Sequence, residues 1–272
     1  MRIHPKQRQD ALLLLIAKHG FLSVRELAEQ LQVSEMTIRR DLRVLEEKGL
    51  VDSVTGGVEV SRSANEPSFH AKRLLQQAEK WAIAKAALKW IEPNMTVGFS
   101  AGTTTWMLAN RMTGFRDLTF VTNSTNIALE LSQRGWSNII LSGGYFRTPS
   151  DALVGPLAER SLRMLHVDVL FLGVHGLDVG QGLTTPNLSE AAVDRLFMER
   201  ASKVIVLCDH TKWGIRALAH IANLDEVDLV ITDDGVSSHA VRALSDHGIE
   251  VVIAPCEELP KAMKFSEERR DR

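Results

Sequence analysis

Residues 34–49 are the segment that most restricts the fold of this chain. Ser34 can accept a hydrogen bond from an unpaired N–H of a first helical turn, and Gly49 can take the left-handed conformation that ends a helix. Between them, apolar side chains recur at helical spacing on one face, and polar side chains point the opposite way. The inward set is Ile38, Leu42 and Leu45, and the outward set is Met36, Arg40, Arg43 and Glu47. The segment predicts an amphipathic helix that presents arginine to its surroundings.

The residues on either side of this helix complete a winged helix-turn-helix. A first helix is expected over residues 7–19, and a second over 24–31, where Ser23 and Glu26 have the spacing of a capping box. Residues 50–60 predict two short strands around Gly56-Gly57, which form a wing. Helix, turn, helix and wing in this order indicate a domain that reads double-stranded DNA with its third helix in the major groove.

The N-terminal region must attract DNA through the local placement of its basic residues, because its net charge is close to zero. Residues 1–60 carry nine Lys or Arg and nine acids, so this region is neutral overall. We expect Ser34 and Asp41 to shape the third helix; alternatively, the segment is a small helical domain with a solvated charged face. The basic cluster of residues 2–8 either contacts the DNA backbone or frays. The candidate DNA-binding residues are Ser34, Met36, Thr37, Arg39, Arg40 and Arg43.

Length and composition are those of a soluble two-domain protein. The chain has 272 residues, of which 44% are apolar and 24% charged. We expect a DNA-binding domain over 1–60, a linker over 61–76, a second domain over 77–256 and a disordered tail over 257–272. The sequence shows no signal peptide and no apolar run of about 18 residues, and its two cysteines form no disulfide framework. These features favour the cytoplasm, and no pattern indicates a metal or cofactor.

The second domain alternates short apolar strands with helices. Such a pattern predicts an α/β fold with a mainly parallel sheet covered on both faces. The expected strands are 95–99, 118–122, 138–141, 167–172, 203–208, 229–232 and 250–253. The expected helices are 77–90, 104–112, 126–134, 157–165, 189–201 and 237–247.

Polar and glycine residues follow several of these strands, at the sheet edge where α/β proteins bind ligands. Residues 99–105 (FSAGTTT) join a strand to a helix and suit a phosphate group, although an ordinary strand-to-helix turn would look the same. Asp178 and Glu190 either bind sugar hydroxyls or cap helices and turns, and Lys212 supplies a cation or is a solvent-facing loop residue. The candidate effector-binding residues are Ser100, Gly102, Thr103, Thr104, Thr105, Asn123, Ser124, Gly143, Gly144, Gly176, Asp178, Thr184, Thr185, Glu190 and Lys212.

Two enzymatic alternatives have weaker support. Gly98 to Gly102 matches the G-x-S-x-G nucleophile elbow, with Ser100 as nucleophile. Its partners would be Asp209 or Asp233 with His239 or His247, but both histidines fall in a predicted helix and no oxyanion segment precedes the strand. A sugar-phosphate isomerase would use Asp178, Glu190 or Asp209 as acid and base, but these residues form no tight acidic cluster in the sequence. We therefore expect no enzyme.

Several motifs in order resemble the DeoR family of bacterial transcriptional regulators. They are SEMTIRRDL (34–42), AGTTT (101–105), VTNS (121–124), SGG (142–144), ALVGP (152–156), FLGVHGLD (171–178), GLTTPN (182–187) and DHTKWG (209–214). The resemblance implies a winged helix-turn-helix joined to a sensor domain related to ribose-5-phosphate isomerases. It also implies control by a phosphorylated sugar and repression of carbohydrate uptake or catabolism genes. Two DNA-binding domains on one palindromic operator would require a homodimer or homotetramer.

The chain departs from the family pattern at two places. The family often has Asp where this chain has Ser100, which changes how a sugar hydroxyl or phosphate is held. The wing commonly carries Arg and His where this chain has Ser53 and Thr55. Fewer wing cations release fewer counterions, so we expect weaker backbone contacts and a flatter salt dependence.

Overall fold

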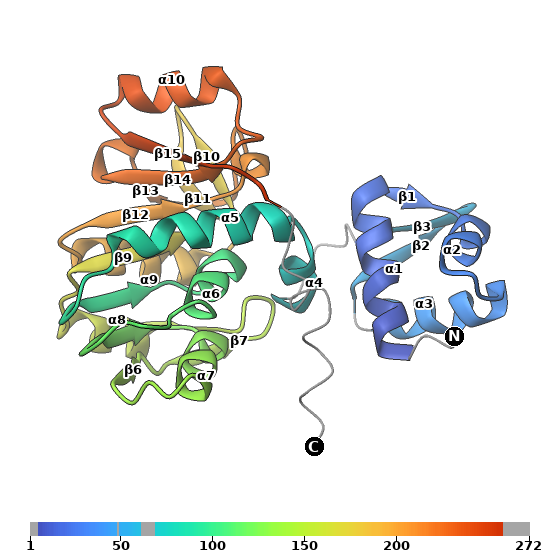
Figure 1. The fold of residues 1–272 in the computed structure, drawn as a ribbon, viewed down its shortest axis with the longest axis horizontal. Coiled ribbons are helices and arrows are strands. Elements are labelled where there is room, and N and C mark those ends of the chain that lie inside the picture. The colour runs from blue at the N-terminus through green and yellow to red at the C-terminus, as the bar shows by residue number, and fades with distance from the viewer. Residues whose placement is uncertain (1–4, 48, 61–68, 258–272) are drawn as a thin grey trace. The chain divides into compact units, whose positions relative to one another are not determined.

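The computed structural model describes residues 5–47, 49–60 and 69–257, and it divides into two compact units, Met1–Leu75 and Gln76–Arg272. Figure 1 shows the elements of both units. The predicted linker is partly wrong, because residues 69–74 form a helix in which Phe69 is buried. Residues 61–68 of that linker, and 258–272 of the predicted tail, lie outside the described residues. The first residue of the tail, Glu257, is described and pairs with Lys85 at 2.8 Å.

The N-terminal unit is the expected winged helix-turn-helix. Its elements are α1 (Pro5–His19), β1 (Phe21–Leu22), α2 (Val24–Leu31), α3 (Glu35–Glu47), β2 (Val51–Val54), β3 (Gly57–Val60) and α4 (Phe69–Leu74). The strands form an antiparallel sheet in the order β1-β3-β2. Ser23 and Glu26 form the predicted capping box at the start of α2. Gly57 allows the wing to approach β1, since a Cβ there would lie 2.4 Å from the carbonyl oxygen of Leu22.

A seven-stranded parallel sheet forms the centre of the C-terminal unit. All seven predicted strands are confirmed, and they lie in the order β15-β14-β12-β9-β4-β5-β6. Their bounds are β4 (Thr96–Phe99), β5 (Thr119–Thr122), β6 (Ile139–Leu141), β9 (Val169–Gly173), β12 (Val204–Leu207), β14 (Leu229–Asp233) and β15 (Glu250–Ala254). Because the strands are parallel, their carboxyl ends lie at one edge of the sheet.

Helices cover both faces of the sheet, as predicted. The helices are α5 (Gln77–Ala87), α6 (Thr103–Ala109), α7 (Thr125–Gln133), α8 (Pro156–Arg163), α9 (Leu188–Glu199) and α10 (Ser238–Asp246), with 3-10 turns η1 (Leu88–Trp90), η2 (His210–Lys212) and η3 (Leu224–Glu226). One apolar core joins α5, α6 and α7 to the sheet through residues such as Ile83, Leu108 and Ile127. The other joins α8, α9 and α10 through residues such as Leu162 and Phe197.

Five short strands beside this sheet were not expected. A hairpin of β7 (Tyr145–Arg147) and β8 (Ala152–Val154) follows β6. A second antiparallel sheet contains β10 (Gly176–Asp178), β11 (Gly182–Thr185) and β13 (Ala219–Ala222). Both additions come from loops that follow strands of the parallel sheet, so they border its carboxyl edge.

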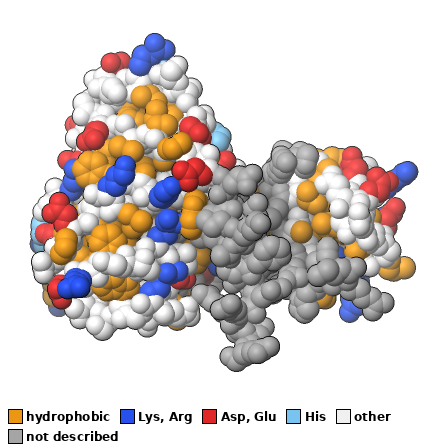
Figure 2. All heavy atoms as spheres, viewed as in Figure 1, with side chains coloured by type: hydrophobic (Ala, Val, Ile, Leu, Met, Phe, Trp, Pro, Cys, Tyr) orange, Lys and Arg blue, Asp and Glu red, His pale blue; other side chains and the backbone are white. Residues whose placement is uncertain are grey.

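Surface charge in the C-terminal unit is mixed. The whole chain has 32 Lys or Arg and 34 Asp or Glu, and both signs are interspersed on the face drawn in Figure 2. Among the described residues, no helix is long and apolar enough to cross a membrane.

Candidate functional site

Helix α3 begins at the cap that the sequence predicts. The Ser34 Oγ accepts a hydrogen bond from the backbone N–H of Thr37 at 3.3 Å, and the two hydroxyl oxygens lie 2.9 Å apart. Gly49, with φ +65°, follows the other end, where the N–H of Leu50 donates to the carbonyl of Leu45 at 2.9 Å. Ser34 thus shapes the helix, and its hydroxyl already has protein partners.

The inward and outward faces of α3 are confirmed. Ile38, Leu42 and Leu45 are buried in the core of the N-terminal unit. Met36, Arg39, Arg40 and Arg43 are exposed, and Thr37 is half-buried. Arg39 lies 3.6 Å from Glu35 in an exposed ion pair. Among the described residues, no ion pair holds Arg40 or Arg43, so both guanidinium groups are available to a ligand.

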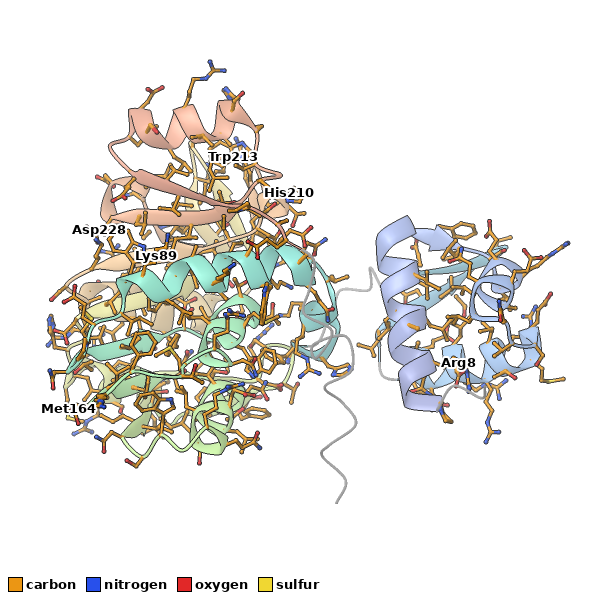
Figure 3. All side chains as sticks on the ribbon, in the orientation of Figure 1. Arg8, Lys89, Met164, His210, Trp213 and Asp228 are labelled. Atoms are coloured by element: carbon orange, nitrogen blue, oxygen red, sulfur yellow. The ribbon has the colours of Figure 1, made fainter. Side chains whose placement is uncertain are left out.

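A buried ion pair fixes α3 to α1. Arg8 donates to Asp41 through Nε and, at 3.3 Å, through Nη2, and Gln9 donates to the same carboxylate at 3.3 Å. The Arg8 and Asp41 side chains retain 12% and 4% of their exposure. Arg8, labelled in Figure 3, is therefore engaged with Asp41 and helps to orient α3. The predicted role of Asp41 in shaping the helix is supported by this contact.

The wing exposes few cations. Ser53, Val54 and Thr55 at its tip are exposed, and the Ser53 N–H donates to Glu46 at 3.2 Å. Ser53 and Thr55, the two positions where the sequence lacks the cations of the family pattern, are therefore both exposed to solvent.

At the carboxyl edge of the parallel sheet, Ser100 and Asn123 connect three strands. The Ser100 Oγ accepts from the Gly173 N–H at 2.9 Å, and the Asn123 Oδ1 accepts from the Ala101 N–H at 2.8 Å. Asn123 also donates through Nδ2 to the Leu153 carbonyl at 3.4 Å, which links β5 to the β7–β8 hairpin. Ser100 and Asn123 are buried, so they position the ends of β4, β5 and β9.

Several of the predicted ligand hydroxyls are used within the protein. Thr105 Oγ1 donates to the carbonyls of Ser100 (2.8 Å) and Gly102 (3.0 Å), and Thr104 is buried. Ser124 caps α7 by accepting from the Ile127 N–H at 3.3 Å. Thr103 begins α6 and is half-buried, as are Ala101 and Gly102 before it, so these three residues are the accessible part of the segment.

Gly143 and Gly144 form the turn from β6 to the hairpin. Both have positive φ, +69° and +121°. A Cβ on Gly144 would lie 2.7 Å from the Val154 carbonyl oxygen, so this position allows a close backbone approach. Their geometry is accounted for by the turn.

Glu190 lies in a buried polar cluster that the sequence did not predict. Arg147 from β7 donates to Glu190 Oε1 at 2.8 Å and to Ser150 at 3.2 Å. Ser150 donates to the same carboxylate oxygen, and Thr185 donates to Oε2 at 3.2 Å. Because the carboxylate is paired with the half-buried guanidinium group of Arg147, it is poorly suited to act as a free general base.

Asp178 and Thr184 organise the small sheet. Asp178 accepts from Arg216 (3.1 Å) and from the Gly180 and Gln181 amides (3.0 Å each). Desolvation acts to raise the pKa of Asp178, but these bonds, with Arg216 foremost, lower it below its usual value. Thr184 Oγ1 accepts from the Ala217 N–H at 3.0 Å and donates to the carbonyl of Gly176 at 3.4 Å.

The end of β12 contains the most unusual acid of the site. Asp209 is buried, and its Oδ1 accepts from the Thr211 amide at 3.1 Å and from the Thr211 hydroxyl. Its Oδ2 has no hydrogen-bond partner among the residues that the structure describes. A buried acceptor without a partner is costly, which makes it a strong candidate for a ligand contact. Lys212, three residues further along, is half-buried. The sequence analysis considered Asp209 only as a catalytic acid in the two enzymatic alternatives. It did not predict that one of its carboxylate oxygens would lack a partner.

His210 and Asp233 form a second unpredicted pair. Asp233 accepts from the His210 backbone N–H and from Nδ1, both at 2.7 Å. Gly235 leaves room for the ring, since a Cβ there would lie 2.6 Å from His210 Nδ1. The imidazole is thus held at the carboxyl edge beside Asp209.

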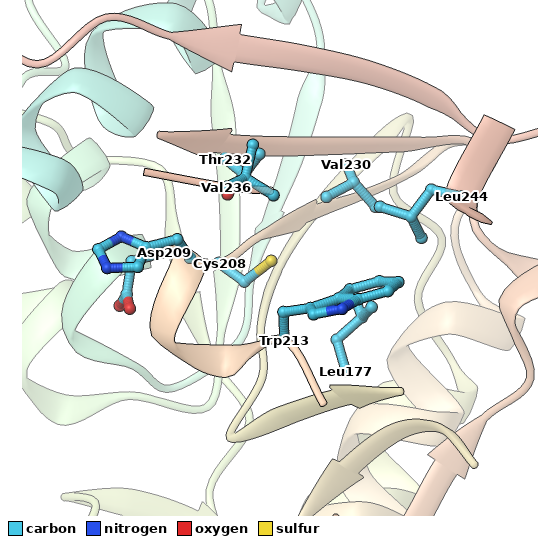
Figure 4. Close-up of a pocket in the computed structure, with 9 residues that line it drawn as sticks. Leu177, Cys208, Asp209, Trp213, Val230, Thr232, Val236 and Leu244 are labelled. Atoms are coloured by element: carbon cyan, nitrogen blue, oxygen red, sulfur yellow. The ribbon is translucent and has the colours of Figure 1, made fainter. Parts of the chain in front are cut away.

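A small cavity lies behind this edge, as Figure 4 shows. Leu177, Cys208 and Trp213 line it together with Val230 and Leu244. Its volume of about 10 Å³ fits roughly one water molecule. The Cys208 Sγ points into it, whereas the Asp209 carboxylate points away. Burial raises the pKa of the Cys208 thiol, so this side chain lines the cavity as an uncharged group and is not suited to act as a nucleophile.

The hydrolase alternative lacks its partners. Ser100 is fully buried, and among the described residues no hydrogen bond joins it to a histidine. His247 instead bonds to the Ala243 carbonyl at 2.8 Å, and His239 lies in the first turn of α10.

Comparison with known proteins identifies the two units. A model described as the DeoR-like helix-turn-helix domain matches residues 8–64, and one described as the DeoR C terminal sensor domain matches residues 75–234.

Curated relatives match along nearly the whole chain. The HTH-type transcriptional regulator GlpR of Haloferax volcanii is 37% identical over 91% of this chain and 97% of that protein. The putative aga operon transcriptional repressor of Escherichia coli O157:H7 is 33% identical over 91% of this chain and 93% of that protein.

Solved structures match more weakly. Ribose 5-phosphate isomerase from Plasmodium falciparum is 17% identical, with a TM-score of 0.36 over 50% of this chain and 52% of its own. The identification therefore rests on the two domain matches and the curated relatives. The chain belongs to the DeoR family of DNA-binding transcriptional regulators.

Proposed function

We propose that this regulator represses genes of carbohydrate uptake or catabolism and responds to a phosphorylated sugar at the carboxyl edge of its parallel sheet. The observation that carries the proposal is the unpartnered Oδ2 of Asp209. A sugar hydroxyl would supply the donor that this buried oxygen lacks. The name of the aga operon repressor supports the repressor role. A regulator that acts on bacterial DNA would work in the cytoplasm.

The geometry favours a division of labour within the site. Lys212 and the first amides of α6, near Gly102 and Thr103, would hold a phosphate, because a cation and free helix N–H groups both favour an anion. Asp209 would hold a hydroxyl. Ser100, Asn123 and Glu190 would act indirectly, because their side chains already bond to the protein.

DNA reading would require two copies of the chain. A dimer or tetramer built by the C-terminal unit would place two α3 helices on a palindromic operator, with half-sites one helical turn or a multiple apart. An effector that binds one arrangement of the two α3 helices better than another would change operator affinity.

The proposed domain bounds follow the two compact units, which divide between Leu75 and Gln76.

Direct titration of sugar phosphates tests the effector site. Isothermal titration calorimetry would compare the wild-type protein with Lys212→Ala and with Lys89→Ala as a matched control. Lys89 is an exposed lysine of η1, which precedes β4 and so lies toward the opposite edge of the sheet. We expect one phosphosugar to bind wild type and Lys89→Ala equally and Lys212→Ala at least 10-fold more weakly, as for loss of a charged hydrogen bond. Equal binding by all three proteins would contradict the site.

A further inference from the structure

The recognition helix carries one large apolar side chain on its outer face. Met36 is 80% exposed, in the first turn of α3. It shares the outward stripe with Arg40 and Arg43, which lie one and two turns further along the helix. An apolar side chain this exposed has no role in the core of the N-terminal unit.

The neighbouring positions of the first turns are already engaged or turned inward. Thr37 is bonded to Ser34, and Ile38 is buried. Glu35 is an anion that faces Arg39 at 3.6 Å. Of the described side chains at the start of α3, Met36 is therefore the large apolar group that is exposed on the outer face.

The major groove displays one apolar group, the 5-methyl of thymine. We propose that Met36 contacts this methyl group and so selects thymine at one position of each half-site. A thioether side chain is flexible and carries no strong donor or acceptor, so it can pack on a methyl without leaving a polar group unpaired. This inference presupposes that α3 binds DNA, and it adds which base one of its side chains selects.

The spacing along α3 locates the thymine. Met36 and Arg40 are separated by about one helical turn, roughly 5.4 Å, and successive base pairs are about 3.4 Å apart. If Arg40 contacts a guanine, the preferred contact for arginine, the thymine lies within about two base pairs of it.

Base analogues test the contact at the level of one methyl group. The operator is first obtained by in vitro selection with the full-length protein, and each thymine is then replaced singly by deoxyuridine. Fluorescence anisotropy at fixed salt compares wild type, Met36→Ala and Met164→Ala. Met164, at the end of α8, is the matched control because it is a 76% exposed methionine of the C-terminal unit.

We expect deoxyuridine at one thymine of the half-site to weaken wild type and Met164→Ala about fourfold, the value of one buried methyl. Met36→Ala should bind the normal operator more weakly and lose this sensitivity. The proposal is overturned if no thymine shows the effect, or if Met36→Ala keeps it. Failure of the wild-type protein to bind any selected DNA would instead contradict the DNA-binding function itself.

Discussion

The two units place their candidate residues in opposite environments. In the N-terminal unit, Arg40 and Arg43 are exposed, and the helix beneath them is fixed by the buried Arg8–Asp41 pair. In the C-terminal unit, Asn123 and Glu190 are buried and bonded to the protein. DNA is a large ligand that comes to a surface, whereas a small metabolite is enclosed. The first site can therefore be recognised from exposed charge, and the second from a buried polar atom without a partner.

The largest expected effect comes from breaking the Arg8–Asp41 ion pair, which fixes the DNA-binding helix α3 to α1. Asp41→Ala should lower the free energy of unfolding of the N-terminal unit by about 3–5 kcal/mol, because it removes the buried carboxylate to which both Arg8 and Gln9 donate. Urea unfolding measures the change. Glu35→Ala, which removes only an exposed pair with Arg39, is the matched control and should cost roughly 0.5 kcal/mol or less. Similar losses in both variants would mean that the buried pair does not hold α3.

The next largest effect is expected at Asp209, where a substitution should affect ligand affinity and protein stability differently. Asp209→Asn should change the stability of the free protein little, because it replaces one buried polar group without a partner among the described residues by another. The same variant should bind the sugar phosphate about 10-fold or more weakly, since a hydrogen bond to a charged acceptor is lost. Thermal unfolding with and without ligand measures both quantities. A variant that is less stable yet binds normally would show that Asp209 is structural.

A pH dependence should arise from Asp194, which lies in α9 one turn after Glu190. Burial, with a smaller contribution from the Glu190 charge, raises the pKa of Asp194 well above its usual value. A raised pKa means that this carboxyl favours the folded state fully below its unfolded pKa and loses that contribution as the pH rises through the folded pKa.

Asp194→Asn should therefore gain stability over wild type as the pH rises from 5 to 8. Urea unfolding across this range measures the difference, and Glu199→Gln, an acid in the last turn of the same helix, provides the comparison. A difference between Asp194→Asn and wild type that stays constant with pH would contradict the proposed protonation.

The smallest expected effect concerns the wing. Thr55→Arg adds a cation at an exposed position, so the slope of log affinity against log salt should become steeper by about 0.9 if the new side chain reaches a phosphate. Thr55→Ala should leave the slope unchanged. Operator titrations between 50 and 200 mM salt, roughly the range where such slopes are resolved, provide the test.

Strong local patterns explain what could be predicted from the sequence. The seven strands of the parallel sheet are short apolar runs, and Ser23, Ser34 and Gly49 mark helix ends by their own chemistry. The β7–β8 hairpin and the β10-β11-β13 sheet were missed because most of their strands are not continuous apolar runs and include Arg147, Asp178 and His220.

Partner choice explains what could not be predicted. Arg147 and Glu190 are 43 residues apart, and His210 and Asp233 are 23 residues apart. No local spacing encodes which oxygen is left without a donor, because that depends on how β12 meets β9 and β14. The sequence could therefore mark the sheet edge as a candidate site, but it could not separate side chains that are free to meet a ligand from those bonded within the protein.

Operator affinity with and without the effector tests the central claim most directly. The full-length protein would be titrated on its selected operator by fluorescence anisotropy, near physiological salt, with each sugar phosphate that binds in calorimetry. The account predicts that one of them changes the affinity by about 5- to 150-fold, the usual range of coupling between two sites. A sugar phosphate that saturates the C-terminal unit and leaves operator affinity unchanged would contradict the account.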